Sequence, residues 1–597
     1  MTGSFETVEA ALAEVRNALG DGEYLIAHDT ADQALKLWPD EVELRHALVL
    51  ALARTGAVAQ AWKQFDELGL DRIRSREVLS LKARLSKDLA IGADGRLDSG
   101  YLQQSISDYT AAHEVDPGYF PAINVATLSA LAGNADQADR WARSALDDAD
   151  LHLDTDGYYA EATRAEALLL LGRTDEAHRS LQRAASLPDA GAGVRSTTRK
   201  QLRLICRNLG LDDTLLDALR QPGIVHYSGH IIAAPGKPGR FPADQEDEVR
   251  REMTAFFAGR RFGRAIGSLA AGADILAAEA ALEAGVELVV VLPFETDEFI
   301  DISVRPSGGD WVDRFHVCLD QARTVHFVTQ DEYLGDDDLF GYATEYALGL
   351  TRLRAQWLDA ETHQLSVWDG TAGPSAAAGT THDMEAARRA GFGQTVIRVE
   401  PDPDFRRASA GDAPARAFSR SRRGLIFGDF KGFSKLTDRQ LPAYITSVLG
   451  MCAEVFARYD ANLKFSNTWG DGIFLVFDDL GAAANCAFDL QETVAAIDRD
   501  SIGLPETFGL RLGFHYGPVY VADDPVLKRP NCFGFHVSRA ARIEPITPEG
   551  SVYVTEQTAA SLAMSCPDDY RCDYVGTQPL AKGYGSFPMY HLRRIGS

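Results

Sequence analysis

The chain has 597 residues, of which 45% are hydrophobic and 24% are charged, a composition that is ordinary for a folded protein. Because a single hydrophobic core stops growing near roughly 250–300 residues, this length predicts three or four structural units. The formal net charge is −26, from 86 acidic and 60 basic residues. That balance argues against a protein that wraps duplex nucleic acid, since such proteins need basic patches to displace counterions.

No segment of the sequence predicts a membrane protein. The first residues contain neither the basic nor the apolar region of a signal peptide, and no run of 18 apolar residues occurs. The seven cysteines include no CxxC pair, which indicates neither a disulfide framework nor a zinc site. We therefore expect a protein of the reducing cytoplasm without a membrane span.

Helical periodicity dominates residues 1–221. Three stretches share a first helix, a glycine-containing turn and an alanine-rich second helix, with alanine five residues after the glycine: Gly56 and Ala61, Gly133 and Ala138, Gly172 and Ala177. This arrangement resembles tetratricopeptide repeats, whose period is roughly 34 residues. Two interpretations remain open, a concave surface for a protein partner and a structural spacer or dimerisation arm.

Residues 222–400 change to alternating strand and helix patterns, which predict a doubly wound, Rossmann-like α/β unit with a buried parallel sheet. The expected elements are strands at Gly223–His230, Val286–Leu292, Thr324–Thr329 and Gln394–Val399, and a helix at Glu246–Ala258. Residues 401–420 are rich in Pro, Ala and Arg and are expected to form an interdomain linker.

A glycine-rich loop in this α/β region is a candidate second ligand site. Gly267, Ser268 and Gly272 stand between a short strand and a helix, where backbone amides of such folds attract anions. The loop is similar to that of SLOG-type nucleotide-sensor domains. The alternative is that the glycines only permit close packing of helix against strand.

Residues 421–597 follow a βαββαβ order, which predicts a ferredoxin-like split fold. Asp429 ends the first strand and Asp471 lies at a hairpin tip, so the fold can bring the two together. Adjacent carboxylates repel each other unless they share divalent cations. Two such cations would activate a ribose 3′-hydroxyl and hold a triphosphate. The alternative is that each aspartate only shapes a turn. A turn is also expected at Gly517-Pro518, between two strands.

Five ordered motifs in this region resemble the class III adenylate/guanylate cyclases: FGDFKGFS (427–434), NTWGDGIFLVF (467–477), RLGFHYGPV (511–519), NCFGFHVSRAARIEP (531–545) and AKGYG (581–585). The resemblance implies a head-to-tail homodimer in which Asp429, Asp471 and the carbonyl of Phe430 hold two Mn²⁺ or Mg²⁺ ions. It further implies that Arg542 of the other protomer stabilises charge on the reacting phosphates. Lys582 falls where the family has a lysine for the terminal phosphates.

Three positions depart from the family's usual residues. Asn467 replaces the lysine and Asn531 the aspartate with which ATP-using members read adenine. Ser538 replaces an asparagine that positions the ribose or the transition state. Because an amide offers both a donor and an acceptor, the two asparagines could read uracil or cytosine. Guanine remains chemically possible, and ATP is the least supported substrate.

Residues 533–556 look like the cyclases of bacterial Pycsar anti-phage systems. That resemblance implies synthesis of cyclic UMP, or next cyclic CMP, with phage infection as the trigger and a separate effector that reads the product. Two alternatives remain open. One is a sensor-linked adenylate or guanylate cyclase, and the other is a nucleotide-binding pseudo-cyclase that acts through its repeats.

Overall fold

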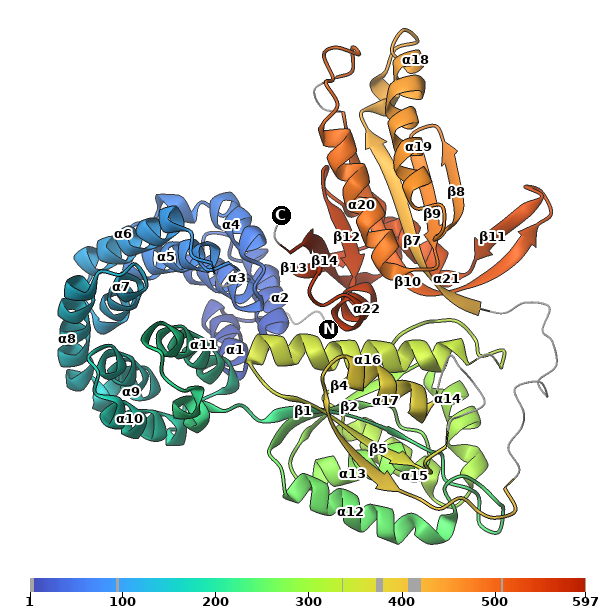
Figure 1. Cartoon of the computed structure of the whole chain (residues 1–597), viewed down its shortest axis with the longest axis horizontal. Helices are drawn as coiled ribbons and strands as arrows, with labels where there is room; N and C mark the ends of the chain where they lie inside the picture. Colours follow the sequence, from blue (N-terminus) through green and yellow to red (C-terminus); the bar gives the residue numbers. More distant parts are fainter. Residues whose placement is uncertain are drawn as a thin grey trace.

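The computed structural model describes residues 5–92, 96–335, 337–371, 379–405, 420–505 and 508–595. It confirms the predicted fold class, because a helical array, a parallel-sheet unit and a C-terminal α+β unit follow one another along the chain (Figure 1). Most of the linker expected at 401–420 lies outside the described residues. None of the described helices has the length and apolar character needed to cross a membrane.

The helical array is a curved stack of paired helices, with α11 on its inner side (Figure 1). The turn glycines Gly56, Gly133 and Gly172 all have positive φ, and the alanines that follow them are buried, as the repeat pattern predicts. The helices are α1 (Val8–Asp21), α2 (Tyr24–Leu35), α3 (Val42–Thr55), α4 (Val58–Glu67), α5 (Arg76–Ala90), α6 (Ser99–Val115), α7 (Tyr119–Leu131), α8 (Ala135–Leu151), α9 (Leu153–Leu170), α10 (Thr174–Ser186) and α11 (Ala192–Leu209).

The parallel-sheet unit has strand order β4-β3-β2-β1-β5-β6, with every neighbouring pair parallel. Sequence analysis missed β5 because buried polar residues, among them Gln364 and Ser366, interrupt its apolar pattern. It also missed α16. The strands are β1 (Gly223–Gly229), β2 (Phe262–Gly267), β3 (Glu287–Leu292), β4 (Thr324–Phe327), β5 (Thr362–Trp368) and β6 (Gly393–Arg398). The helices are α12 (Glu246–Ala258), α13 (Ala273–Glu283), α14 (Thr296–Ser303), α15 (Trp311–Gln321), α16 (Asp338–Leu358) and α17 (Thr380–Arg389).

The C-terminal unit is built on a sheet of order β13-β14-β12-β10-β7-β9-β8, with β11 paired to β10. Its strands are β7 (Arg420–Lys431), β8 (Leu463–Trp469), β9 (Gly472–Phe477), β10 (Gly509–Asp524), β11 (Arg529–Phe533), β12 (Val552–Thr555), β13 (Tyr570–Pro579) and β14 (Ser586–Arg594). Its helices are α18 (Leu441–Ala443), α19 (Leu449–Arg458), α20 (Leu480–Ala495), α21 (Phe535–Ile543) and α22 (Glu556–Ser565), with a π-helical segment at Tyr444–Val448.

The turn predicted at Gly517-Pro518 is wrong, because β10 runs through both residues without a break. Pro518 is tolerated since β12 pairs with β10 only at Leu512–Phe514, which leaves Pro518 with one neighbouring strand, β7. Gly517 allows the ring of His536 to pack closely against β10. A methyl group there would lie 2.8 Å from the ring carbon Cγ of His536.

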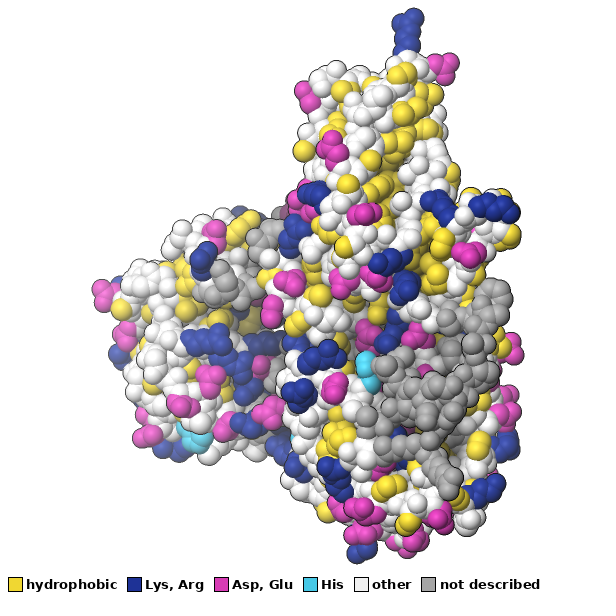
Figure 2. All heavy atoms as spheres, turned by 45° about the vertical axis from the view of Figure 1, so that its right-hand side comes forward, with side chains coloured by type: hydrophobic (Ala, Val, Ile, Leu, Met, Phe, Trp, Pro, Cys, Tyr) yellow, Lys and Arg dark blue, Asp and Glu magenta, His cyan; other side chains and the backbone are white. Residues whose placement is uncertain are grey.

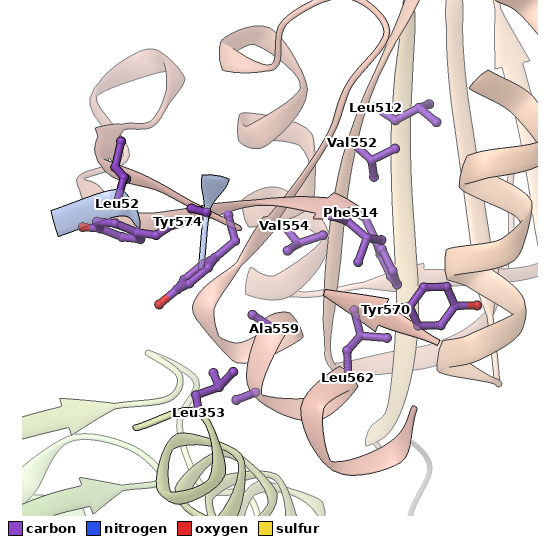
Figure 3. Packing of buried hydrophobic residues seen from close by; sticks show 14 of the residues in the cluster. Leu52, Leu353, Leu512, Phe514, Val552, Val554, Ala559, Leu562, Tyr570 and Tyr574 are labelled. Carbon is purple, nitrogen blue, oxygen red and sulfur yellow. The ribbon is translucent and has the colours of Figure 1, made fainter. Parts of the chain in front are cut away.

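A continuous apolar core joins the three units. Leu52 of α3, Leu353 of α16, Leu562 of α22 and Tyr574 of β13 belong to one buried cluster (Figure 3). Close packing of α16 on α22 adds a buried hydrogen bond, in which the Tyr346 hydroxyl donates to Glu556 at 2.5 Å. The three units therefore pack against one another through a shared core.

A buried ion cluster also crosses a boundary between units. Glu23, just before α2, pairs with Arg264 of β2 and with Arg354 of α16, the latter at 3.1 Å. Although burial raises the pKa of Glu23, Arg354 and Arg264 lower it overall. The carboxylate thus stays charged and ties the helical array to the parallel sheet.

Candidate active site

The structure brings the two predicted metal-binding aspartates together. Asp429 lies inside β7, which extends two residues beyond it to Lys431, whereas the sequence predicted that Asp429 ends this strand. Asp471 follows Gly470, whose φ is 71°, in the turn between β8 and β9. The backbone N–H of Phe430 donates to the carbonyl of Asp471 at 3.3 Å. Asp429 in β7 and Asp471 in the β8–β9 turn therefore lie next to each other, close enough for the charge of Asp471 to act on Asp429.

Asp429 has an arginine partner that sequence analysis missed. Arg511, which is opposite Asp429 in the β7–β10 register, donates to its Oδ2 atom at 2.9 Å and also pairs with Glu544. Burial raises the pKa of Asp429, Arg511 opposes this shift, and the charge of Asp471 adds to it. Burial likewise raises the pKa of Glu544 to about 7. The site thus has three carboxyl groups and one guanidinium.

The donor set fits divalent cations. Mg²⁺ is commonly held by one or two carboxylates together with water and substrate phosphates, so Asp429, Asp471 and the Phe430 carbonyl suffice. The charge of Asp471 contributes to the raised pKa of Asp429, and a shared cation would relieve that repulsion. No group of three or more His, Cys, Asp or Glu side chains in the described ranges, this site included, is arranged to hold a metal. Metal binding here would therefore rest on the two aspartates, the backbone carbonyl, water and substrate phosphates. A bound cation would compete with Arg511 for Asp429.

A hydrogen bond and aromatic packing stabilise the turn that carries Asp471. The Tyr444 hydroxyl donates to the carbonyl of Gly470 at 2.9 Å. The buried ring of Phe430 stacks on Phe508 with centroids 5.4 Å apart and meets Tyr444 edge-on at 5.5 Å. This aromatic packing fixes the backbone around both carboxylates.

Three further predicted residues stand apart from the carboxylates. Ser538 and Arg542 are four residues apart on α21 and therefore share one face of this helix. Lys582 is exposed in a short turn and has a φ of 62°. In the part of the chain that the structure describes, no hydrogen bond or ion pair joins Arg542 or Lys582 to Asp429 or Asp471.

The two predicted base-reading residues lie on different strands, and each has contacts within the chain. The Asn531 amide donates to Asp524 at 2.9 Å, while its oxygen accepts from the backbone N–H of Cys532 at 2.8 Å. Arg529 of the same strand, β11, approaches the Asn467 oxygen of β8 at 3.5 Å. The intrachain bonds of Asn531 leave one N–H and one oxygen lone pair for a base.

The structure indicates different roles for the glycines and for the serine of the candidate second ligand site. A methyl group at Gly267 would lie 2.5 Å from the Tyr227 ring, and one at Gly272 would lie 2.6 Å from the nitrogen of Ile232. These distances favour the packing interpretation of both glycines. Ser268 instead lines a cavity of about 720 Å³, and its hydroxyl has no hydrogen-bond partner among the described residues. A ligand contact by Ser268 stays a prediction.

Comparison with protein families assigns two of the three units. Residues 419–594 match the adenylate and guanylate cyclase catalytic domain, and residues 23–129 match the Tetratricopeptide Repeats-Sensor family. The C-terminal unit is therefore a class III cyclase catalytic domain, a family that generally uses two divalent metal ions, and the array contains sensor-type repeats. The predicted resemblance to these two families is confirmed.

Curated relatives match only part of the chain. A putative adenylate cyclase 3 of Rhizobium meliloti is 31% identical over 137 residues, or 22% of this chain and 22% of the relative. An adenylate cyclase of Streptomyces coelicolor is 31% identical over 142 residues, or 23% of this chain and 33% of the relative. The chain thus spans about a fifth to a third of the length of these relatives.

Solved cyclase structures resemble the same third of the chain. The adenylyl cyclase CyaB from P. aeruginosa is 16% identical with a TM-score of 0.27, over 30% of this chain and 95% of that chain. The guanylate cyclase domain of RhGC from Catenaria anguillulae, in complex with GTP, is 18% identical with a TM-score of 0.26, over 30% of this chain and 99% of that chain. At these scores the likeness carries no argument about function.

Proposed function

We propose that this chain is a sensor-linked nucleotidyl cyclase, which converts a nucleoside triphosphate into a 3′,5′-cyclic nucleotide and diphosphate. The observation that carries the proposal is the pairing of Asp429 and Asp471 at neighbouring strands of a class III cyclase domain. Both carboxylates and Arg542 are present, which favours a working enzyme over a pseudo-cyclase.

The proposed mechanism assigns a separate task to each group. Mn²⁺ or Mg²⁺ ions held by Asp429, Asp471 and the Phe430 carbonyl would activate the ribose 3′-hydroxyl and neutralise phosphate charge. Arg511 orients Asp429 through its hydrogen bond. Arg542 stabilises charge on the reacting phosphates, a role suited to a guanidinium that is always cationic.

We propose that the active site is completed by a second copy of the chain in a head-to-tail homodimer. Arg542, Ser538 and Lys582 would then come from one protomer and the carboxylates from the other, with Lys582 on the terminal phosphates. Figure 2 shows hydrophobic side chains gathered over the surface of the cyclase domain, the upper lobe in that view. The exposed large apolar residues of the cyclase domain include Ile445, Trp469, Val521, Val526, Leu527 and Phe533. Such surface is typical of an interface.

Two substrate classes are proposed, each on its own observation. Relatives named adenylate cyclase favour a purine triphosphate, ATP first and GTP next. The asparagines at 467 and 531 instead favour UTP, or next CTP, because neither supplies the charged contact that reads adenine. Only a cyclic pyrimidine product would support a role as the signal generator of an anti-phage system with a separate effector.

The test is incubation of the purified full-length protein with ATP, GTP, CTP and UTP plus Mn²⁺, followed by mass spectrometry of the products. A cyclic AMP or cyclic GMP product supports the purine candidate, and cyclic UMP or cyclic CMP supports the pyrimidine candidate. Asp471→Asn is the matched negative control. Binding of nucleotide without any product, under conditions in which the protein is a dimer, would favour the pseudo-cyclase.

A further inference from the structure

A cavity of about 620 Å³ lies where the three units of the chain meet. Its walls come from helices α3, α5 and α11 of the array, from α16 of the parallel-sheet unit, and from α22 and β13 of the cyclase domain. Leu353, Ala559, Leu562 and Tyr570 form part of its apolar wall and are visible in Figure 3. The volume is within the range of sites that hold nucleotide-sized ligands.

The charge of this cavity is opposite to that of the chain as a whole. The chain carries a net charge of −26, yet only one acidic residue, Asp88, lines the cavity. Seven basic residues line it: Arg54, Arg84, Lys87, Lys200, Arg203, Arg207 and Arg571. Low-dielectric walls strengthen such a local field and concentrate anions within it.

Four of these cations have no carboxylate within 4.0 Å among the residues that the structure describes: Arg54, Lys87, Lys200 and Arg207. Arg54 donates to the carbonyl of Leu19 at 2.9 Å, while its buried Nε has no partner. Among the described residues, the side chain of Lys200 donates to the carbonyls of Gln356 and Trp357, at 3.1 and 2.8 Å, and to no carboxylate.

Lys87 is likewise held by neutral groups, the amide oxygens of Gln201 at 3.1 Å and Asn124 at 3.4 Å. Burial lowers the pKa of Lys87, and it lowers the pKa of Lys200 to about 8. Arg54 and Lys87 are half-buried, whereas Lys200 and Arg207 are exposed at the rim of the cavity. Partial burial of a cation without a counterion is costly, and an anion placed between these groups would offset that cost.

We propose that this cavity binds a multiply anionic, phosphate-bearing small molecule of nucleotide size. Arginine forks and lysine ammonium groups are the side chains that recognise phosphate oxygens. The aromatic residues Tyr24, Trp357 and Tyr570 on the same walls offer apolar surface to a ring attached to the phosphate. The site lies outside the residues proposed for catalysis, so the inference stands independently of the substrate of the cyclase.

Occupancy of this cavity would connect the three units. Arg54 and Lys87 belong to the helical array, the carbonyl acceptors of Lys200 belong to α16, and Arg571 belongs to the cyclase domain. A phosphate group bound among them replaces mutual repulsion by attraction across the junction. The ligand would therefore favour one arrangement of the units and act as a regulator of the cyclase.

The test is isothermal titration calorimetry of the full-length protein with inorganic tripolyphosphate in EDTA, which removes the cations that the catalytic site needs. We expect saturable binding and a rise in melting temperature, with no binding of uncharged adenosine. Lys200→Gln and Arg207→Ala should each weaken binding about tenfold or more, since each removes a charge-assisted contact. Arg207 is exposed at the rim and has no bonded partner among the described residues, so its variant should fold.

Two control variants separate this site from others. Lys36→Ala removes an exposed lysine that pairs with Asp32 on α2, and Lys582→Ala removes a residue of the proposed catalytic site. Both should bind tripolyphosphate as tightly as the wild type. Absence of binding to the wild type, equal binding by Arg207→Ala and the wild type, or loss of binding in Lys582→Ala would each overturn the proposal.

Discussion

The contact between α16 and α22 allows a quantitative test of how closely the parallel-sheet unit packs against the cyclase domain. Gly349 of α16 faces the backbone of Ala560 in α22. A methyl group built on Gly349 would lie 2.6 Å from both the carbonyl carbon and Cβ of Ala560, whereas ordinary contacts are 3.4–4 Å. Because the obstructing atoms are backbone and Cβ, a rotamer change cannot relieve the clash, and Gly349→Ala must push the helices apart.

The expected cost follows from two opposing terms. Overpacking of this kind costs about 1–3 kcal/mol, while alanine in a helix gains about 1 kcal/mol over glycine. The net destabilisation relative to the wild type should be about 0–2 kcal/mol. Relative to an unobstructed glycine-to-alanine change in a helix it should be about 1–3 kcal/mol, which corresponds to a melting temperature lower by about 2–12 °C for a unit of 150–250 residues. The Tyr346–Glu556 hydrogen bond, one turn away, should weaken as well.

Differential scanning calorimetry of the full-length Gly349→Ala variant measures this loss, and Gly450→Ala is the matched control. Gly450 lies in α19, and a methyl group there would meet no atom within 4 Å. The control should melt at or slightly above the wild-type temperature. If Gly349→Ala melts like the control, the two helices are not packed as closely as the structure indicates and the reasoning fails.

Three further predictions concern single carboxylates. Asp471→Asn should lower the cyclase rate constant by about a thousandfold or more without changing the melting temperature, because a metal ligand supplies several kcal/mol to the transition state; steady-state assays and calorimetry measure the two effects. Burial, aided by the charge of Asp274, raises the pKa of Asp383 to about 8. Between about pH 4 and pH 8 the folded protein therefore keeps a proton that the unfolded chain releases. The free energy of unfolding should fall as the pH rises through this range. Asp383→Asn should flatten that decline in melting-temperature profiles. Glu23→Gln should destabilise the protein by up to about 3–5 kcal/mol in denaturant titrations, since it leaves Arg354 without a carboxylate partner among the described residues and leaves Arg264 with Glu287 alone.

Each of these predictions has an outcome that contradicts it. Full activity of Asp471→Asn would remove this carboxylate from the metal site. Parallel pH profiles for Asp383→Asn and the wild type would mean that Asp383 is ionised in the folded state at neutral pH. Unchanged stability of Glu23→Gln would show that Glu287 and water compensate the two guanidinium groups without Glu23.

Local patterns in the sequence were sufficient to predict some features of this molecule. The glycine turns of the repeats and the proximity of Asp429 to Asp471 follow from short-range spacing within a known order of elements. The partnership of Arg511 with Asp429 depends on the register of β7 against β10, which no local pattern specifies. Glu544 lies within the motif at residues 531–545, but only the structure shows that its carboxyl group contacts Arg511 and so belongs to the site.

Other features depended on tertiary packing that overrides local preference. Gly517-Pro518 has the composition of a turn, yet the ring of His536 above Gly517 and the pairing with β7 keep β10 extended. Strand β5 has buried polar residues at positions where an isolated sequence predicts solvent. The side-chain oxygen of Gln364 accepts a hydrogen bond there from Gln394 of β6 at 2.8 Å, while its buried Nε2 has no partner among the described residues. Such pairs can be seen only after the sheet is assembled.

The packing between units also decides how regulation of this protein is best studied. The hydroxyl of Tyr342, in α16, donates to the carbonyl of Tyr516 at 2.7 Å, and its ring meets that of His536 edge-on at 5.5 Å. His536 lies on α21, the helix that also carries Arg542. The parallel-sheet unit therefore touches the proposed catalytic helix directly. Because one apolar core spans all three units, removing residues 1–400 would expose buried surface on the cyclase domain as well as remove the proposed regulatory cavity. Point substitutions at the junction separate these effects, whereas truncation combines them.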